Sequence, residues 1–172
     1  MGKTKMNKKT KLGLIIALIL LVAVITSPAF SQKNNDQKEI TIQTRDFTLK
    51  NLKGEEITLT DYSGKIIILD FMGTNCPACA EEMSHLKQIK QQYGDQVVIL
   101  SIATESQQKL IKFKQNHDAI WQFLIDQDYK VFSQNNVEYI PKIMIFNQQG
   151  DLIYQGEGET TAQTMHQKIQ NN

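Results

Sequence analysis

Residues 65–80 read KIIILDFMGTNCPACA, and this stretch decides the fold. Its first seven residues are almost wholly apolar, which is typical of a short strand that is buried on both faces. Cys76 and Cys79 follow, and Pro77 between them fits the first turn of a helix, where its missing N–H costs nothing. The stretch therefore predicts a buried strand, a short loop and a helix that begins at a cysteine pair.

The remainder of the chain alternates strands and helices around this stretch. We expect a β-hairpin of residues 47–49 and 57–59 ahead of it. After residue 79 we expect strands over 97–103, 121–125, 143–146 and 152–155, and helices over 80–93, 107–116, 129–134 and 160–170. Strand–helix–strand alternation implies parallel pairing, and a hairpin near residues 147–150 implies an antiparallel edge. The pattern predicts an α/β domain with a mixed central β-sheet flanked by helices.

The N-terminal segment has a different composition. Five lysines among the first eleven residues precede a run, residues 12–25, that is continuously apolar or small. This is the layout of a signal peptide with an exit near Ala29, and residues 12–30 also just reach the roughly 17 residues that span a membrane. Because the positive flank stays inside, the body is expected outside the cytoplasm. We divide the chain into a signal peptide or membrane anchor (1–30), a linker (31–38) and a folded domain (39–172).

Charge and cysteine usage narrow the function. The net charge of +1 gives no general reason to expect nucleic-acid binding. The two cysteines of the sequence lie three positions apart, so a bond between them closes almost no loop and stabilises the fold little. A redox dithiol or half of a metal site is the better interpretation.

The two cysteines are expected to have different roles. Cys76 lies at the start of the predicted helix, where unpaired N–H groups and the helix dipole stabilise a thiolate. Cys79 lies one turn further on, in line with Met83 and Leu86 on the apolar face. We expect Cys76 to be the exposed nucleophile and Cys79 the shielded, resolving thiol.

Residues 70–79, preceded by Gly64-Lys65 and followed by Glu82-Met83, resemble the TlpA-like (ResA-like) branch of the thioredoxin superfamily. The similarity covers about residues 45–170. It includes the N-terminal hairpin and a TlpA-type insertion, residues 104–128, which plain thioredoxins lack. The resemblance implies a thioredoxin-like fold and thiol–disulfide oxidoreductase activity. We expect no cofactor and no metal.

One departure from this branch bears on substrate binding. Most of its members carry Trp immediately before the first cysteine, and many carry Trp at the position of Met72. This chain has Asn75 and Met72, and so lacks an aromatic wall beside the reactive sulfur. Its substrate preference is expected to differ, whereas the dithiol chemistry is not. Asn75 and Pro77, on either side of Cys76, are assigned to the substrate-binding surface.

The resemblance also implies roles for two acids. It places Asp70 under the dithiol, where a desolvated carboxyl has a raised pKa and can accept the proton of Cys79. It matches Glu82 to an active-site glutamate, which we expect to modulate the thiol pKa while the helix dipole favours its charged form. The alternatives are a solvent-facing aspartate at a strand end and a solvated acid in the first helical turn.

Pro141 completes the candidate site. In the family that the chain resembles, this residue is a cis-proline beside the dithiol. A proline has no N–H that could compete for ladder hydrogen bonds, so the backbone of Ile140 is free to pair with a substrate segment as a short strand.

We therefore expect an extracytoplasmic thiol–disulfide oxidoreductase, acting as a monomer and reducing disulfides of exported proteins. Its electron donor would lie at the membrane or outside the cytoplasm. The alternative is a copper-binding chaperone of the thioredoxin type. Cys76, Cys79 and His85 give at most a partial metal site, since a closed zinc site needs about four ligands. A peroxidase of the peroxiredoxin type needs Thr three residues before its reactive cysteine, where this chain has Gly73.

Overall fold

The structure is a computed structural model, and it describes residues 40–171. The predicted signal peptide or anchor (1–30) and the linker (31–38) lie outside the described residues. Within residues 40–171, no helix has both the length and the apolar character needed to cross a membrane.

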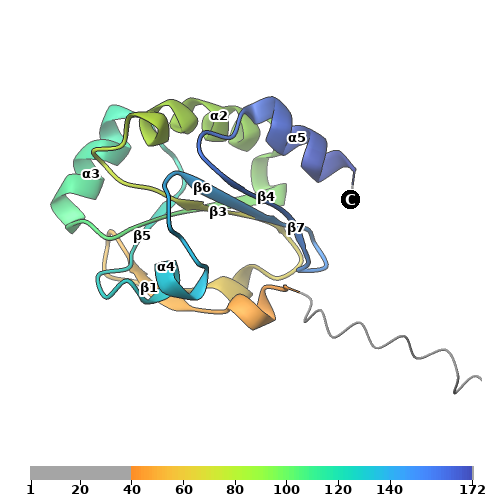
Figure 1. Cartoon of the computed structure of the whole chain (residues 1–172), viewed down its shortest axis with the longest axis horizontal. Helices are drawn as coiled ribbons and strands as arrows, with labels where there is room; N and C mark the ends of the chain where they lie inside the picture. Colours follow the sequence, from red (N-terminus) through yellow and green to blue (C-terminus); the bar gives the residue numbers. More distant parts are fainter. Residues whose placement is uncertain (1–39, 172) are drawn as a thin grey trace, which may run out of the picture. The chain divides into compact units, whose positions relative to one another are not determined.

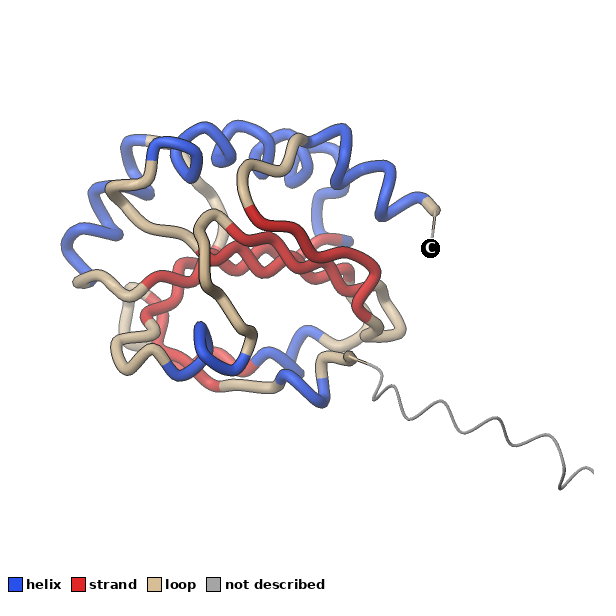
Figure 2. The backbone as a smooth tube through the Cα atoms, viewed as in Figure 1, coloured by secondary structure: helices blue, strands red, loops and turns tan. Residues whose placement is uncertain are grey.

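In the described part of the chain, one mixed sheet runs in the order β2-β1-β5-β4-β3-β6-β7 (Figures 1 and 2). The neighbours β3, β4 and β5 pair in parallel, and the other pairings are antiparallel. The predicted mixed sheet is therefore confirmed. The strands are β1 (Thr48–Asn51), β2 (Glu56–Thr58), β3 (Ile66–Phe71), β4 (Val97–Ala103), β5 (Gln122–Ile125), β6 (Lys142–Phe146) and β7 (Leu152–Glu157).

Helices cover both faces of the central strands. Helices α2, α3 and α5 lie on one face and the short α4 lies on the other (Figure 1). The helices are α2 (Pro77–Tyr93), α3 (Gln107–Asn116), α4 (Lys130–Gln134) and α5 (Ala162–Gln170). Short 3-10 turns are η2 (Gln43–Arg45), η3 (Leu59–Tyr62) and η4 (Gly94–Gln96). The thioredoxin-like α/β architecture expected from the sequence is thus present, with α3 and β5 formed by the insertion.

Most element boundaries differ from the prediction by one to three residues, and two of these differences have clear local reasons. Helix α2 begins at Pro77, within the cysteine pair, and not at residue 80, because Cys76 occupies the N-cap and Pro77 the first helical position. The strand predicted to end at Leu59 stops at Thr58. The buried Leu59 instead begins the 3-10 turn η3, from which it packs into the core.

Strand β3 is buried along its whole length and separates two apolar clusters. Ile66 and Ile68 pack in the cluster that includes α2, α3 and α5, whereas Ile67 and Leu69 pack in the cluster that includes α4. Since side chains alternate along a strand, Asp70 faces the same side as Ile68, toward α2. Burial of each isoleucine or leucine side chain of β3 stabilises the fold by about 1.5–3 kcal/mol.

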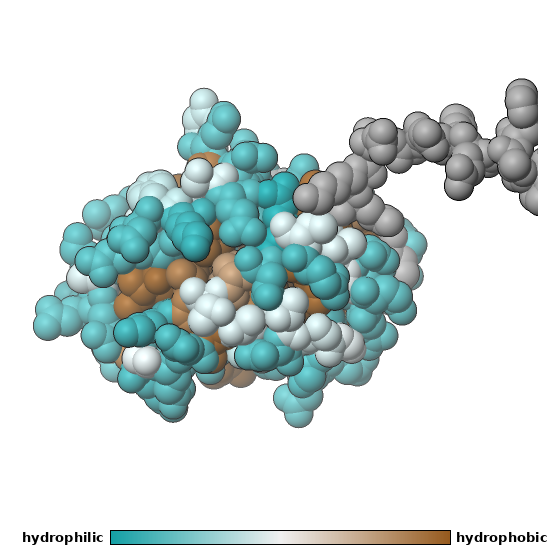
Figure 3. Space-filling view, turned by 90° about the horizontal axis from the view of Figure 1, so that it is seen from below, coloured by the Kyte–Doolittle hydropathy of each residue, from teal (hydrophilic) through white to brown (hydrophobic). Residues whose placement is uncertain are grey.

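The surface on the side of β1 and α4 is mostly hydrophilic, with apolar side chains showing only between polar ones (Figure 3). The buried apolar side chains of the described residues form two clusters, one on each face of the sheet.

The register of the sheet brings distant segments to the end of β3. Asp70 pairs with Ser101 of β4 on one side and with Ile143 of β6 on the other. Phe71 pairs with Lys142, the residue that follows Pro141. The segment before β6 therefore arrives beside the loop that leads from β3 to the cysteine pair.

Candidate active site

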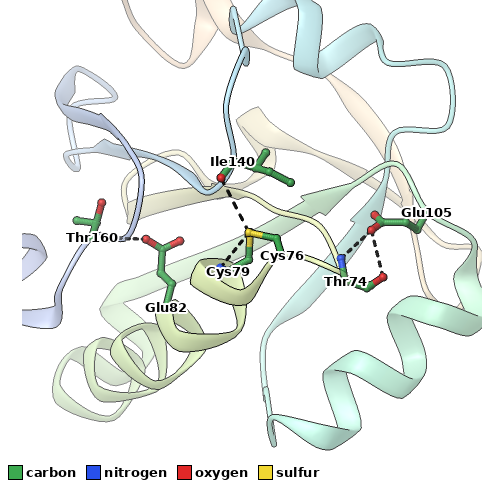
Figure 4. Close-up of a disulfide and its surroundings, with 7 residues drawn as sticks. All are labelled: Thr74, Cys76, Cys79, Glu82, Glu105, Ile140 and Thr160. Atoms are coloured by element: carbon green, nitrogen blue, oxygen red, sulfur yellow. Dashed lines mark hydrogen bonds between the residues drawn. A yellow bond between two sulfur atoms is a disulfide. The ribbon is translucent and has the colours of Figure 1, made fainter.

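The two cysteines form a disulfide at the start of α2, with their Cα atoms 5.2 Å apart (Figure 4). Cys76 caps the helix, and its sulfur accepts a hydrogen bond from the N–H of Cys79 at 3.1 Å. Cys76 is half-buried, whereas Cys79 is fully buried. The helix start therefore offers one sulfur to solvent together with an N–H donor that stabilises negative charge on it.

The segment before β6 lies against the exposed sulfur. The carbonyl oxygen of Ile140 is 3.9 Å from Cys76 Sγ, and the bond between Ile140 and Pro141 is cis. The side chain of Ile140 is 39% exposed, and Asn75 and Pro77 are exposed as well. The residues assigned to substrate binding thus surround Cys76 on the open side of the disulfide.

Asp70 lies on the opposite, buried side. Its Oδ2 accepts a hydrogen bond from the Ser101 hydroxyl at 2.6 Å, and the indole N–H of Trp121 donates to the same hydroxyl oxygen at 2.9 Å. Burial raises the pKa of Asp70 to about 7, although the hydrogen bond with Ser101 partly opposes the shift. The burial expected for Asp70 is confirmed, and its role as a proton acceptor stays a prediction.

Glu82 is also buried, one turn after Cys79. Its Oε1 accepts a hydrogen bond from the backbone N–H of Thr160 at 2.7 Å. Burial, followed by the negative charge of Asp70, raises the pKa of Glu82 to about 9. The helix dipole was expected to favour the charged form of Glu82, but burial and the neighbouring carboxylate outweigh a dipole effect of about 1 kcal/mol. The alternative of a solvated acid in the first helical turn is wrong, because Glu82 is buried.

The protonation of the two acids is linked, because each carboxyl shifts the pKa of the other. Asp70 Oδ1 and Glu82 Oε2 are buried and have no hydrogen-bond partner among the described residues. Two carboxyl groups in contact cannot both ionise easily, so they titrate as a unit. Near neutral pH, burial and mutual repulsion therefore disfavour ionisation of both carboxyls at once. Such a pair can take up or release a proton beside Cys79.

A third acid holds the loop between β3 and α2. Glu105 Oε1 accepts hydrogen bonds from the backbone N–H of Thr74 at 2.6 Å and from its hydroxyl at 3.2 Å (Figure 4). A side chain at Gly73 would collide with Ile140, since a Cβ there would lie 2.8 Å from Ile140 Cδ1. The loop therefore fits closely between Glu105 and the segment before β6.

Residues 40–155 match the AhpC/TSA family. The chain belongs to this family. It is 24% identical to the thiol-disulfide oxidoreductase ResA of Halalkalibacterium halodurans, over 94% of this chain and 95% of the relative. It is 28% identical to the thioredoxin-like protein YneN of Bacillus subtilis, over 90% of this chain and 95% of the relative.

The solved structures agree on the fold of this AhpC/TSA member. A secreted Mycobacterium tuberculosis disulfide oxidoreductase, homologous to E. coli DsbE, matches it with a TM-score of 0.68 at 19% identity. The match covers 76% of this chain and 98% of that structure. Together with the ResA relatives, this confirms the thioredoxin-like fold and identifies the chain as a thiol–disulfide oxidoreductase.

Sequence reasoning missed several groups around the acids of this AhpC/TSA protein. Ser101 could have been found from the sequence, because it is the one polar residue in the apolar strand 97–103. Trp121 is buried in the core, and its N–H also donates a hydrogen bond to the Ser101 hydroxyl. Neither Thr160, which acts through its backbone, nor Glu105 gave any signal in the sequence.

The residues considered for metal binding are not gathered in one place. Among residues 40–171, no group of three or more His, Cys, Asp and Glu side chains is arranged to hold a metal ion. His85 is half-buried, and its Nε2 lies 2.9 Å from Glu159 Oε1.

Proposed function

We propose that this oxidoreductase is an extracytoplasmic disulfide reductase that acts on exported proteins. The observation that carries the proposal is the asymmetry of the dithiol. Cys76 is half-exposed at a helix N-terminus, whereas Cys79 is fully buried, one helical turn before the buried Glu82 and on the side of the sheet that Asp70 faces. An exposed thiolate can attack a protein disulfide, while a shielded thiol next to a proton acceptor can complete the exchange.

In the first step, the Cys76 thiolate attacks one sulfur of the substrate disulfide. A mixed disulfide forms between Cys76 and that sulfur, and the other substrate sulfur leaves as a thiolate and takes a proton from solvent. The N–H of Cys79, 3.1 Å from Cys76 Sγ in the disulfide form, stabilises the attacking thiolate. The exposed backbone of Ile140 beside this sulfur offers the substrate an extended pairing segment.

In the second step, Cys79 gives its proton to the Asp70–Glu82 pair and attacks Cys76 Sγ. The bond between Cys76 and the substrate breaks, the second substrate thiolate leaves, and the Cys76–Cys79 disulfide forms. The substrate has gained two electrons, which the dithiol has lost. We assign proton acceptance to Asp70, whose pKa of about 7 matches a neutral working pH, and modulation to Glu82. A dithiol donor outside the cytoplasm must then reduce the enzyme again.

Two observations support the location. The lysine-rich flank ahead of residues 12–25 has the layout of an export signal or anchor. The M. tuberculosis protein that shares the fold is itself described as secreted.

A trapping experiment tests chemistry, substrate class and location together. In cells that express Cys79→Ser, mixed disulfides should accumulate between Cys76 and exported proteins, because the resolving thiol is absent. In cells that express Cys76→Ser, no such adducts should form, and the purified variant should reduce a peptide disulfide no faster than the uncatalysed exchange. Adducts composed of cytoplasmic proteins, or undiminished turnover by Cys76→Ser, would refute the proposal.

A further inference from the structure

A small polar pocket lies beside the dithiol and takes no part in the steps above. Its volume is about 220 Å³, and it lies between the loop that carries Cys76 and helix α3. The residues that line it are Thr74, Asn75, Lys109, Lys112, Phe113 and Asn116. Thr74 lies beside the disulfide in a different direction from Ile140 (Figure 4), so a substrate bonded to Cys76 can reach both.

The pocket is cationic. Helix α3 carries three lysines and no acidic residue, and Lys109 and Lys112 are both exposed at the pocket. Neither of them forms an ion pair with another described residue. Glu105 accepts hydrogen bonds from the N–H and hydroxyl of Thr74, one of the lining residues, but it does not itself line the pocket. The excess of positive charge therefore faces the opening.

The chemistry of the wall suits a carboxylate. Two ammonium groups attract negative charge, and the side-chain amides of Asn75 and Asn116 can donate hydrogen bonds to it. The buried ring of Phe113 gives the pocket an apolar side against which a short methylene stem can pack. The volume lies below the roughly 300–1,000 Å³ of typical small-molecule sites, so the pocket fits one side chain rather than a whole cofactor.

We propose that this pocket binds the carboxylate of an aspartate or glutamate adjacent to the substrate cysteine. The inference rests on the proposed function and adds a substrate preference to it: acidic protein segments are reduced faster than neutral ones. Because ion pairs at exposed sites are weak and screened by salt, the preference should be about three- to tenfold at low ionic strength and smaller in salt.

The test uses the full-length, reduced protein and two peptide disulfides that differ only in Asp or Asn next to the cysteine. The readout is the ratio of the two second-order reduction rates. We expect the acidic peptide to react about three- to tenfold faster. The double variant Lys109→Gln/Lys112→Gln should bring the ratio close to one, and Lys109→Glu/Lys112→Glu should invert it in favour of the neutral peptide.

The matched control is Lys50→Gln/Lys65→Gln, which removes the same charge from exposed positions that do not line the pocket. It should keep the wild-type ratio. A wild-type ratio of one, or an equal loss of preference in the control, would overturn the inference while leaving the reductase intact. Failure to reduce either peptide would count against the proposed function instead.

A small disulfide that carries a carboxylate, compared with its neutral amide, distinguishes the source of the anion. If only the peptides show a preference for the carboxylate, the result supports a protein segment as the source of the anion. An equal preference for the small acid would overturn that assignment, because the pocket would then serve low-molecular-weight thiol compounds.

Discussion

The two sides of the disulfide differ in burial and in the charge of the side chains around them. On the inner side, Cys79, Asp70 and Glu82 are fully buried, and each acid is hydrogen-bonded. On the outer side, Asn75 is exposed, Ile140 is 39% exposed, and lysines face solvent. The disulfide thus separates a buried side that carries two acids from an exposed side that carries lysines.

The difference shows what burial does to charge. Inside, desolvation moves the pKa of an ordinary carboxyl to about 7, where it can exchange a proton at neutral pH. On the exposed side, water and salt weaken each ion pair, so substrate binding there needs several weak contacts and depends on ionic strength. The comparison predicts that substitutions on the inner side change stability and pH dependence, whereas those on the outer side change rates with particular substrates.

The largest effect is expected for Asp70→Asn. The folded state holds a proton on Asp70 that the unfolded chain releases between about pH 4 and pH 7, so the free energy of unfolding falls as pH rises through this window. Asparagine does not ionise, so it removes this fall in the free energy of unfolding, and its side-chain oxygen still accepts a hydrogen bond from Ser101. The variant should be more stable by on the order of 2–4 kcal/mol at pH 8 and nearly unchanged at pH 4. Urea unfolding at both pH values, with the disulfide intact, measures this.

The same variant should resolve mixed disulfides more slowly near neutral pH, while its first attack is much less affected. Asp126 is the matched control, because it is equally buried but accepts three backbone N–H bonds at the start of α4. Asp126→Asn should destabilise the protein at both pH values. If Asp70→Asn were also destabilising at pH 8, the inner side would not carry the electrostatic strain that we assign to it.

A smaller effect is expected for Ser101→Ala. The hydroxyl stabilises the ionised form of Asp70, so its loss should raise the pKa of Asp70 further and move the pH midpoint of resolution upward. The indole N–H of Trp121 also loses its acceptor, and stability should fall by about 1–3 kcal/mol. Trp121→Phe, which removes the indole donor and keeps the hydroxyl, is the control and should leave the midpoint nearly in place. An unchanged midpoint in Ser101→Ala would argue against Asp70 as the proton acceptor.

The inner side also shows how far sequence alone can reach. The buried strand β3, the helix start at Cys76 and the burial of Asp70 were predictable, because each follows from a local pattern within residues 65–80. A continuous apolar run places a strand in the core whatever surrounds it, and an aspartate inside that run is buried with it.

The partners of that aspartate were not predictable, because they come from distant parts of the chain. Ser101 lies 31 residues away and reaches Asp70 only through the register of β3 and β4. Thr160 lies 78 residues from Glu82 and contributes a backbone N–H, which carries no side-chain signature. Glu82 was judged from its own helix, where the dipole is favourable, but its pKa is set by the burial and the carboxylate that other elements bring to it.

The smallest effect concerns Glu105, which belongs to the outer side although it is an acid. Its carboxylate fixes the loop ahead of Cys76 through two hydrogen bonds with Thr74, and neither of these bonds involves Asp70 or Glu82. Glu105→Ala should therefore cost about 1 kcal/mol of stability and slow the first attack a few-fold, because the loop that presents Cys76 is held less firmly.

Glu105→Gln retains an acceptor oxygen for the Thr74 N–H and should recover most of that rate, which separates loss of the hydrogen bonds from loss of the charge. Single-turnover measurements on the Ala and Gln variants, across pH, test the separation of the two sides directly. Since Glu105 is placed to hold the loop and not to exchange protons with Cys79, the pH midpoint of resolution should stay at its wild-type value in both. A shifted pH midpoint in Glu105→Ala would show that the outer loop affects the protonation of the buried acids. The two sides of the disulfide would then not act independently, contrary to what we infer.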